Sequence, residues 1–275
     1  MDDSFSLLGL KGENLCRRAE EGGRETSIRH YVFDDLLDTS EKLICYQLPL
    51  NGKFSVFNYV LKKEKHSLFS KFEERELGCY LGFSGGSLFT FEDFNFKIQS
   101  LEEFTLLVEA VEITSGAAFQ FELCNLCQLP EKLPTEMDIL LTVYSKEVKK
   151  LPPLSHFDQV ADENRELLKI AVKGNERAVE KLEREIGREE TERLLKEFKK
   201  KPEELFDTCI LSEGQSYTLI GIVTSVQEVE VEGKILNSIY VFSEDMEFAL
   251  LTQKGEVSEG DRVLTNGKMY GMAVV

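Results

Sequence analysis

The stretch LICYQLPLNGKFSVFNYVL, residues 43–61, carries the clearest structural signal in the chain. Two apolar runs with strand-like composition, residues 43–50 and 54–61, flank the dipeptide Asn51-Gly52. Asn-Gly between two such runs predicts a β-hairpin, because both residues tolerate the positive φ angles that a type I′ turn requires. The segment therefore indicates an antiparallel sheet in the first part of the chain.

The rest of residues 1–150 predicts a mixed α+β region around this hairpin. A short polar helix is expected over residues 13–21, ending at Gly22-Gly23. A second helix is expected over residues 101–112, because Ser100 and Glu103 form a capping box and apolar residues follow at helical spacing. Alternating or apolar runs predict further strands at residues 78–83, 88–98, 117–126 and 139–144.

Residues 151–206 predict a helical connector. Pro152-Pro153 ends the preceding strand, and a helix is expected from about residue 158 to residue 173. Asn175 is placed to cap a second helix that ends at Gly187, and a third helix is expected before Pro202.

Residues 207–275 predict a small all-β unit. Five short strands are expected at residues 217–226, 235–242, 247–252, 262–265 and 268–274, with a hairpin turn at Asn266-Gly267. Their number and spacing favour a five-stranded barrel of the oligonucleotide/oligosaccharide-binding type or an SH3-like barrel. The expected fold class is α+β, with a mixed antiparallel-sheet domain (1–150), a helical connector (151–206) and a C-terminal five-stranded small barrel (207–275).

The charge of the chain excludes some partners. The chain has 50 acidic and 33 basic residues, which gives a formal net charge of −17, and residues 207–275 contain eleven of the acids and four of the bases. Nucleic acid and anionic lipid both require a basic surface, so neither is an expected partner.

The compartment follows from the N-terminus and the cysteines. Met1-Asp2-Asp3-Ser4-Phe5 lacks a basic n-region and an apolar h-region, and no apolar run is long enough to cross a membrane. We therefore expect a cytoplasmic protein. Six cysteines in 275 residues are sparse, and in a reducing compartment they are expected to be buried small hydrophobes.

The residues around each possible catalytic motif do not fit the structure that the motif requires. Gly82-Phe83-Ser84-Gly85-Gly86 matches the G-x-S-x-G nucleophile elbow, but a strand-like run follows it where a helix is required, so a glycine-rich hairpin turn is expected. Cys124 and Cys127 form a lone C-x-x-C with no second pair to complete a zinc site and no helix start to activate a thiol, which favours a structural role. Phosphate-binding motifs are absent, and His30, His66 and His156 are scattered. The sequence thus indicates no cofactor or metal and assigns no catalytic residue.

Glu228, Glu230 and Glu232 are the candidate site residues. They alternate with Val229 and Val231, which places the three carboxylates on one face of a strand. A charge-protected edge strand is one reading of this pattern. The functional reading is an acidic face that docks a basic partner or a divalent cation.

The order of motifs in the second half resembles that of an uncharacterised bacterial family known only as a domain of unknown function. The similarity runs from Leu151-Pro152, through NRELL at residues 164–168 and AVKGNE at residues 171–176, to Phe206-Asp207-Thr208 and YTLIGIV at residues 217–223. It includes the turn Gly260-Asp261 and covers roughly residues 120–275. The resemblance implies a helical segment followed by a small β domain, and no activity.

These observations favour a non-enzymatic interaction or regulatory module that binds a protein partner or associates with itself. The alternative is a hydrolase or small-ligand enzyme with a carboxylate-based site in the N-terminal region. A deep pocket lined by two or more buried acids would support that alternative.

Overall fold

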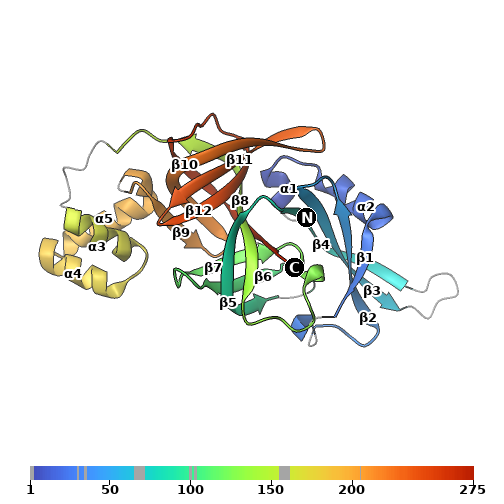
Figure 1. The fold of residues 1–275 in the computed structure, drawn as a ribbon. Coiled ribbons are helices and arrows are strands. Elements are labelled where there is room, and N and C mark those ends of the chain that lie inside the picture. Colours follow the sequence, from blue (N-terminus) through green and yellow to red (C-terminus); the bar gives the residue numbers. More distant parts are fainter. Residues whose placement is uncertain are drawn as a thin grey trace.

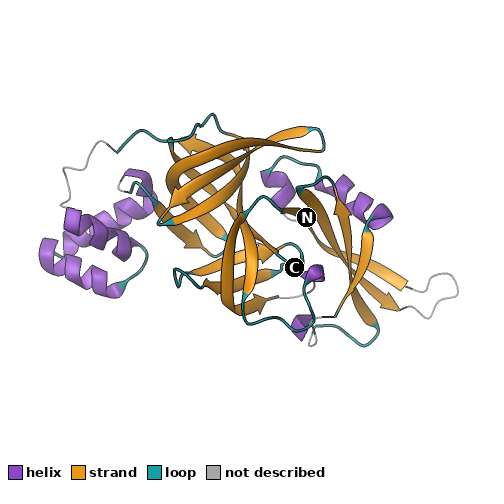
Figure 2. Cartoon of the chain, in the orientation of Figure 1, coloured by secondary structure: helices purple, strands orange, loops and turns teal. Residues whose placement is uncertain are grey.

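Strands dominate the structure, a computed structural model that describes residues 3–29, 31–33, 36–64, 72–98, 101, 104–154, 162–204 and 206–275. The helices are α1 (Asp3–Leu7), α2 (Gly12–Gly22), α3 (Asp162–Val172), α4 (Glu176–Ile186) and α5 (Arg188–Lys200), with short 3-10 turns η1 (Tyr31–Phe33), η2 (Leu126–Gln128) and η4 (Pro202–Glu204). The strands are β1 (Arg24–Ile28), β2 (Glu41–Pro49), β3 (Phe54–Glu64), β4 (Phe72–Phe83), β5 (Ser87–Lys97), β6 (Leu107–Glu112), β7 (Ala118–Leu123), β8 (Met137–Lys150), β9 (Cys209–Glu213), β10 (Ser216–Val231), β11 (Lys234–Ser243), β12 (Met246–Lys254) and β13 (Arg262–Ala273). Figure 1 shows α3–α5 at one end and sheet A, defined below, at the other, and Figure 2 shows the strands between them.

Sheet A contains the predicted hairpin. Its order is β1-β2-β3-β4, all antiparallel, and β2 pairs with β3 from Leu43 opposite Leu61 to Pro49 opposite Ser55. The predicted polar helix is α2, which buries Leu15 and Ala19 against this sheet because its apolar residues lie on one face. The hairpin and the helix are both confirmed.

Sheet B has nine strands and closes on itself twice. Strands β5, β6, β7, β13 and β8 form one ring of paired strands, and β10, β11, β12, β8 and β13 form a second ring. Both rings share β8 and β13. The first half of β8 pairs with β5 and its second half pairs with β12, whereas β13 pairs first with β10 and then with β7.

The predicted fold class is therefore wrong. Strands β10–β13 do not form a self-contained barrel over residues 207–275, because β8 from the first part of the chain closes their ring. The hairpin expected at Asn266-Gly267 is also wrong, since β13 runs through both residues as one strand. Gly267 is required there by close packing: a Cβ would lie 2.4 Å from the carbonyl oxygen of Tyr144 in β8.

The helix expected over residues 101–112 is wrong as well. Leu107–Glu112 is strand β6, whose residues alternate between half-buried and buried. Val108 and Ala110 pair with Phe121 and Phe119 of β7. Strand pairing with β7 thus takes up the backbone hydrogen bonds of a segment whose local spacing favoured a helix. Ser100 and Glu103, the predicted capping box, lie outside the described residues.

Helices α3–α5 form a small cluster beside sheet B. Leu168, Leu182 and Leu194 pack together in it, and the side chain of Asn175 caps α4 as predicted by accepting the amide of Ala178. The strands before and after these helices, β8 and β9, both belong to sheet B. The helices therefore do not connect an N-terminal sheet to a separate barrel, and that part of the predicted fold class is also wrong.

Arg262, at the start of β13, holds this cluster against the sheet. Its side chain is only 7% exposed. The guanidinium donates to the carbonyl oxygens of Pro152, Glu203 and Phe206, at 2.9, 2.6 and 2.6 Å. These carbonyls belong to the segments that leave and re-enter sheet B, so one side chain fixes both ends of the helical excursion.

Candidate interaction site

The second half of β10 leaves the ring as a two-stranded ribbon with β11. Up to Ile222, β10 pairs with β13, and from Ile222 to Val231 it pairs with β11. Among the described strands, β11 is the sole partner of β10 beyond Ile222. One edge of this stretch therefore has no neighbouring strand.

The ribbon presents two of the three candidate carboxylates together. Glu228 and Glu230 are exposed while Val229 and Val231 are buried, so the first two acids share one face. Glu232 follows the strand, with a φ angle of 51° in the turn to β11. Its carboxylate forms an ion pair with Arg18 of α2. We name the ribbon surface formed by Glu228, Glu230 and Ile235 the acidic face.

Ile235 adds an apolar group to the acidic face. It lies directly across the ribbon from Glu230, and it is 60% exposed. Single exposed apolar residues are normal on protein surfaces. Here the isoleucine is next to a strand edge without a partner and to two carboxylates, which is a combination that a docking segment can use.

The turn between β2 and β3 contacts the edge of the ribbon. Asn51 accepts the amides of Lys53 and Phe54 through its side-chain oxygen, and its Nδ2 donates to the carbonyl oxygen of Glu230 at 2.7 Å. Asn51 and Gly52 do not have positive φ angles, so the asparagine side chain, and not a left-handed backbone, orders this turn. A shallow pocket of about 240 Å³ lies between the turn and the ribbon, lined by Asn51, Gly52, Lys53, Glu228, Val229 and Glu230.

The turn end of the ribbon is fixed by contacts with the N-terminal residues. Lys234 Nζ donates to the carbonyl oxygens of Leu8 and Gly9, at 2.7 and 3.1 Å, and to Gln253. Lys234 and Glu232, the charged residues nearest the turn, are therefore both paired. Glu228 and Glu230 form no ion pair with any described residue.

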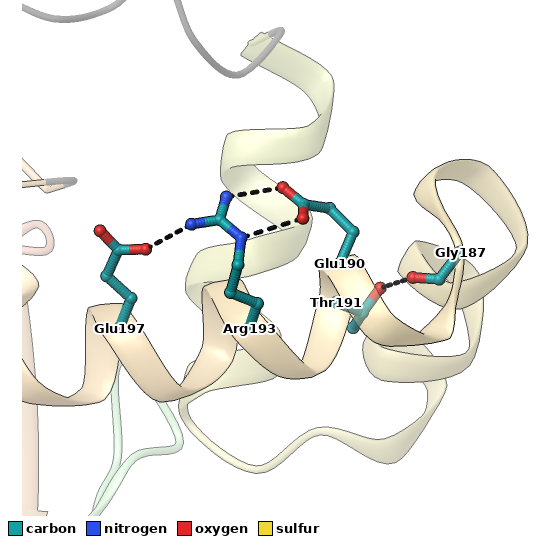
Figure 3. Close-up of polar contacts among 5 residues, drawn as sticks. All are labelled: Gly187, Glu190, Thr191, Arg193 and Glu197. Carbon is teal, nitrogen blue, oxygen red and sulfur yellow. Dashed lines mark hydrogen bonds and ion pairs between the residues drawn. The ribbon is translucent and has the colours of Figure 1, made fainter.

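Helix α5 is also highly charged, but its charges satisfy one another. Figure 3 shows Arg193 bound to Glu190 on one side and to Glu197 on the other. Thr191 in the same helix donates from its hydroxyl to the carbonyl oxygen of Gly187, at 2.9 Å. Pairs at i,i+3 and i,i+4 stabilise a solvent-facing helix. The charges of α5 are therefore less available to a partner than those of the acidic face.

The G-x-S-x-G segment is a turn between the two sheets. Gly82 and Phe83 end β4 of sheet A, and β5 of sheet B begins at Ser87. Ser84 is exposed, and both its amide and its hydroxyl donate to the carbonyl oxygen of Lys53. A turn was predicted here, but the strands it joins do not pair as a hairpin. The nucleophile elbow lacks its helix, because a strand follows.

The cysteines differ from the prediction in one respect. Cys16 of α2 and Cys79 of β4 form a disulfide bond, although all six cysteines were expected to be unpaired. Cys45, Cys124, Cys127 and Cys209 are free thiols, and Cys127 alone among them is partly exposed. In the described part of the chain, no three His, Cys, Asp or Glu side chains are grouped to hold a metal ion. The three histidines lie outside the described residues.

Two carboxylates of the N-terminal region are buried, but they do not share a pocket. Glu112 accepts the amides of Thr114 and Ser115 in the turn after β6. Burial raises the pKa of Glu112, but these hydrogen bonds outweigh burial and leave the pKa below its ordinary value. Glu122 of β7 lies 3.9 Å from Lys268 Nζ, and it is opposite Leu107, at the other end of β6 from Glu112.

Comparison with known proteins gives no relative: no family model, curated protein or solved structure matches the chain. The resemblance to an uncharacterised bacterial family remains an expectation from sequence motifs. In the described residues, the helices are too short or too polar to cross a membrane.

Sequence reasoning missed three parts of this site. The contact of Asn51 with Glu230 joins residues that are 179 positions apart, so no local pattern announces it. Lys234 as an anchor depends on the carbonyls of Leu8 and Gly9 in the same way. Ile235 carried a usable signal, because strand alternation from Glu230 through the tight turn places it on the same face.

Proposed function

We propose that the protein is a non-enzymatic interaction module that binds a basic segment of a protein partner at the acidic face. The observation that carries the proposal is the stretch of β10 beyond Ile222, where exposed Glu228 and Glu230 lie beside a strand edge without a partner. The formal net charge of −17 adds long-range attraction for a basic partner.

The geometry favours an extended segment. The edge of β10 offers backbone amides and carbonyls, apart from the Glu230 carbonyl that accepts from Asn51, so an incoming strand gains main-chain hydrogen bonds, and alternate side chains give specificity. Lysine or arginine side chains of that segment would meet Glu228 and Glu230. An apolar side chain would cover Ile235, which is 60% exposed in the free protein.

The carboxylates and the apolar residue have different roles in this mode of binding. An ion pair between exposed groups contributes about 0.2–1 kcal/mol and weakens with salt, so Glu228 and Glu230 mainly speed association and select a basic partner. Full burial of an isoleucine side chain contributes about 1.5–3 kcal/mol, and Ile235 is 60% exposed, so covering it contributes about 1–2 kcal/mol, at least as much as either carboxylate.

Affinity purification from the native host tests the proposal. The bait is the full chain, compared with a Glu228→Gln/Glu230→Gln variant and with an Ile235→Ser variant. We expect both variants to lose a partner that the natural chain retains, and we expect cross-links from that partner to map to β10 or to the turn at Asn51. Raising the salt from about 0.1 M to 1 M should weaken recovery.

The matched control is Glu189→Gln/Glu192→Gln on α5, which removes the same charge from a surface outside the acidic face. This control should retain the partner. Equal recovery with all variants, or a chain that is a monomer by light scattering and recovers no reproducible partner, would refute the proposal. A dimer that the Ile235→Ser variant dissociates would identify the partner as a second copy of the chain.

The proposal excludes nucleic acid as the ligand of this surface, since stacking and phosphate contacts require exposed aromatics and bases. A single-stranded oligonucleotide binding assay at low salt checks this exclusion. Salt-dependent binding there that is lost in a variant of a basic residue would contradict it.

We also propose a cytoplasmic location, and the Cys16–Cys79 bond makes that part testable. Disulfides are rare in a reducing cytosol. Alkylation of free thiols in intact cells, followed by mass analysis, should find Cys16 and Cys79 reduced there. A fully formed bond in freshly trapped cells would instead indicate an oxidising compartment.

A further inference from the structure

Two free thiols from distant parts of the chain meet between the two sheets. Cys45 lies in the middle of β2 and is fully buried, and Cys127 lies in the η2 turn that follows β7. Gln128, the neighbour of Cys127, donates to Gln47 of the same strand as Cys45, and Tyr59, directly opposite Cys45, donates to the carbonyl oxygen of Cys124. These contacts place the turn over β2 and bring the two thiols together, where each affects the pKa of the other. The C-x-x-C motif therefore supplies one member of a pair whose other member is 82 positions earlier in the chain.

The two faces of sheet A separate this pair from the disulfide. Asn58 of β3 donates to the carbonyl oxygen of Cys16 in α2, whereas its neighbour Tyr59 donates to that of Cys124. Adjacent strand residues point to opposite faces. Cys79 is opposite Asn58 and Cys45 is opposite Tyr59, so the disulfide lies on the α2 face and the thiol pair on the face toward sheet B.

The turn that carries Cys127 is held in place by buried polar contacts. Asn125 is fully buried; its Nδ2 donates to the carbonyl oxygen of Ala273 and its Oδ1 accepts the amide of the same residue, both at 2.8 Å. Gln128 donates to Gln47 of β2 at 3.1 Å. These contacts fix the position of Cys127 over β2 in the reduced protein.

The two thiols have unequal environments. Burial raises the pKa of Cys45 well above its ordinary value. The neighbouring Cys45 thiol, together with the charge of Arg24, lowers the pKa of Cys127 although burial opposes this. Cys127 is also the partly exposed member of the pair. A thiolate that reagents can reach beside a buried thiol is the arrangement of an attacking and a resolving cysteine.

We propose that Cys45 and Cys127 are a redox-active dithiol that small-molecule disulfides oxidise to an intramolecular disulfide. The Cys127 thiolate attacks one sulfur of the small disulfide, so a Cys127–thiol mixed disulfide forms and one small thiolate leaves. Cys45 then attacks the Cys127 sulfur, its proton passes to the departing sulfur, and the second small molecule leaves as a thiol. Two cysteine thiols are oxidised, and one small disulfide is reduced to two thiols.

Oxidation would change how the two sheets are joined. The η2 turn belongs to the connection between β7 and β8 of sheet B, and Cys45 belongs to sheet A. The reduced pair links them through noncovalent contact, and the disulfide would link them covalently. The site therefore couples the redox state of the surroundings to the stiffness of the interface between the sheets.

Thiol counting in glutathione redox buffers tests the proposal. The full chain is equilibrated with reduced and oxidised glutathione in varied ratio, quenched with an alkylating reagent, and analysed as intact and protease-digested protein. Each cysteine is scored by its own peptide, so that the Cys16–Cys79 bond does not enter the result. We expect the Cys45 and Cys127 thiols to be lost together as the ratio becomes oxidising, with a peptide cross-link between them.

Single variants separate the two roles. Cys45→Ser should stop at a mixed disulfide of glutathione on Cys127. Cys127→Ser should form neither the cross-link nor a glutathione adduct on buried Cys45. Cys209→Ser, the matched control, should behave as the natural chain, because Cys209 is buried near the helical cluster and burial raises its pKa to about 12. Circular dichroism of each variant confirms that it is folded.

Several outcomes would overturn the proposal. One is a natural chain that keeps four free thiols in excess glutathione disulfide. Another is a cross-link between Cys127 and Cys124 in place of Cys45, which would make the C-x-x-C motif itself the redox pair. A third is equal alkylation rates for Cys127 and Cys209 in the folded reduced chain, where we expect Cys127 to react on the order of tenfold faster or more.

Discussion

Replacement of Arg262 by methionine should release the helical cluster from sheet B. Methionine keeps most of the side-chain volume and removes the guanidinium that donates to three carbonyl oxygens in the segments flanking α3–α5. The sheet itself loses no strand pairing, because the backbone of Arg262 still pairs with Ile222. The damage should therefore be confined to the attachment of the helices.

The size of the effect follows from how buried each bond is. The bonds to Pro152 and Glu203 are partly buried, so water can replace the lost donor and each costs about 1 kcal/mol. The bond to Phe206 is fully buried and leaves an unpaired carbonyl, which costs about 2 kcal/mol. Nε is buried without a hydrogen bond and lies 3.9 Å from the exposed Asp207 carboxylate; relief of this atom and of guanidinium desolvation returns about 1 kcal/mol. The net loss is about 3 kcal/mol.

Hydrogen exchange measures this loss where it occurs. A change of about 3 kcal/mol corresponds to roughly hundredfold faster exchange of amides that open with the helical cluster. We expect that acceleration in α3–α5, with little change in β2 and β3 of sheet A. Urea unfolding of the same variant should show the corresponding loss in the transition that includes the helices.

The control is Arg193→Met on α5, whose exposed guanidinium makes two helix-surface ion pairs; their loss, about 0.2–0.5 kcal/mol each, should accelerate exchange by no more than about fivefold. The prediction is wrong if Arg262→Met accelerates exchange in α3–α5 by less than about fivefold, corresponding to about 1 kcal/mol. It fails equally if sheet A and the helices accelerate together, because that would make Arg262 part of the global core and not a local clamp.

Three further predictions test other parts of the fold. Gly267→Ala should cost more than about 2 kcal/mol of unfolding free energy by urea titration, because its Cβ would lie 2.4 Å from the Tyr144 oxygen, whereas Gly52→Ala, which meets no atom within 4 Å, should change it by less than about 0.5 kcal/mol. Asn175→Ala should cost about 1 kcal/mol in the same assay through loss of the α4 cap. An Asn175→Asp variant with the unfolding free energy of the natural chain would confirm capping as the cause. The pKa of Glu112 is lowered in the folded chain, so its stabilisation is present above its ordinary pKa of 4.5 and is lost as pH falls through the lower folded value. Glu112→Gln should therefore lose less unfolding free energy than the natural chain on acidification below about pH 5. An identical pH dependence of stability in the two proteins would contradict this.

Local sequence patterns predicted those elements whose stabilising contacts are also local. The hairpin at Asn51, helix α2 and the cap at Asn175 each depend on neighbours within a few residues, and all are present. The helix expected over residues 101–112 failed because its apolar residues fit two periodicities, and β7 decided between them.

The double ring could not be derived from local patterns. Its closure depends on β8 pairing with β12 and β13 from the other end of the chain. The sequence gives no sign that a strand near residue 140 completes a ring near residue 250. For the same reason the acidic carboxylates were found and their surroundings were not, since Asn51 and Arg18 reach them through the tertiary fold. Cys45 was overlooked because its partner is not its neighbour in sequence.

The exchange of strands between the two rings sets the order in which the chain can mature during synthesis. The first ring needs β13, so the outer edges of β7 and β8 stay unpaired while more than a hundred further residues are translated. Open edges of apolar strands invite wrong pairing and aggregation. We therefore expect nascent chains of this protein to depend on holding chaperones until β13 has left the ribosome, and release from them to coincide with the docking of β13.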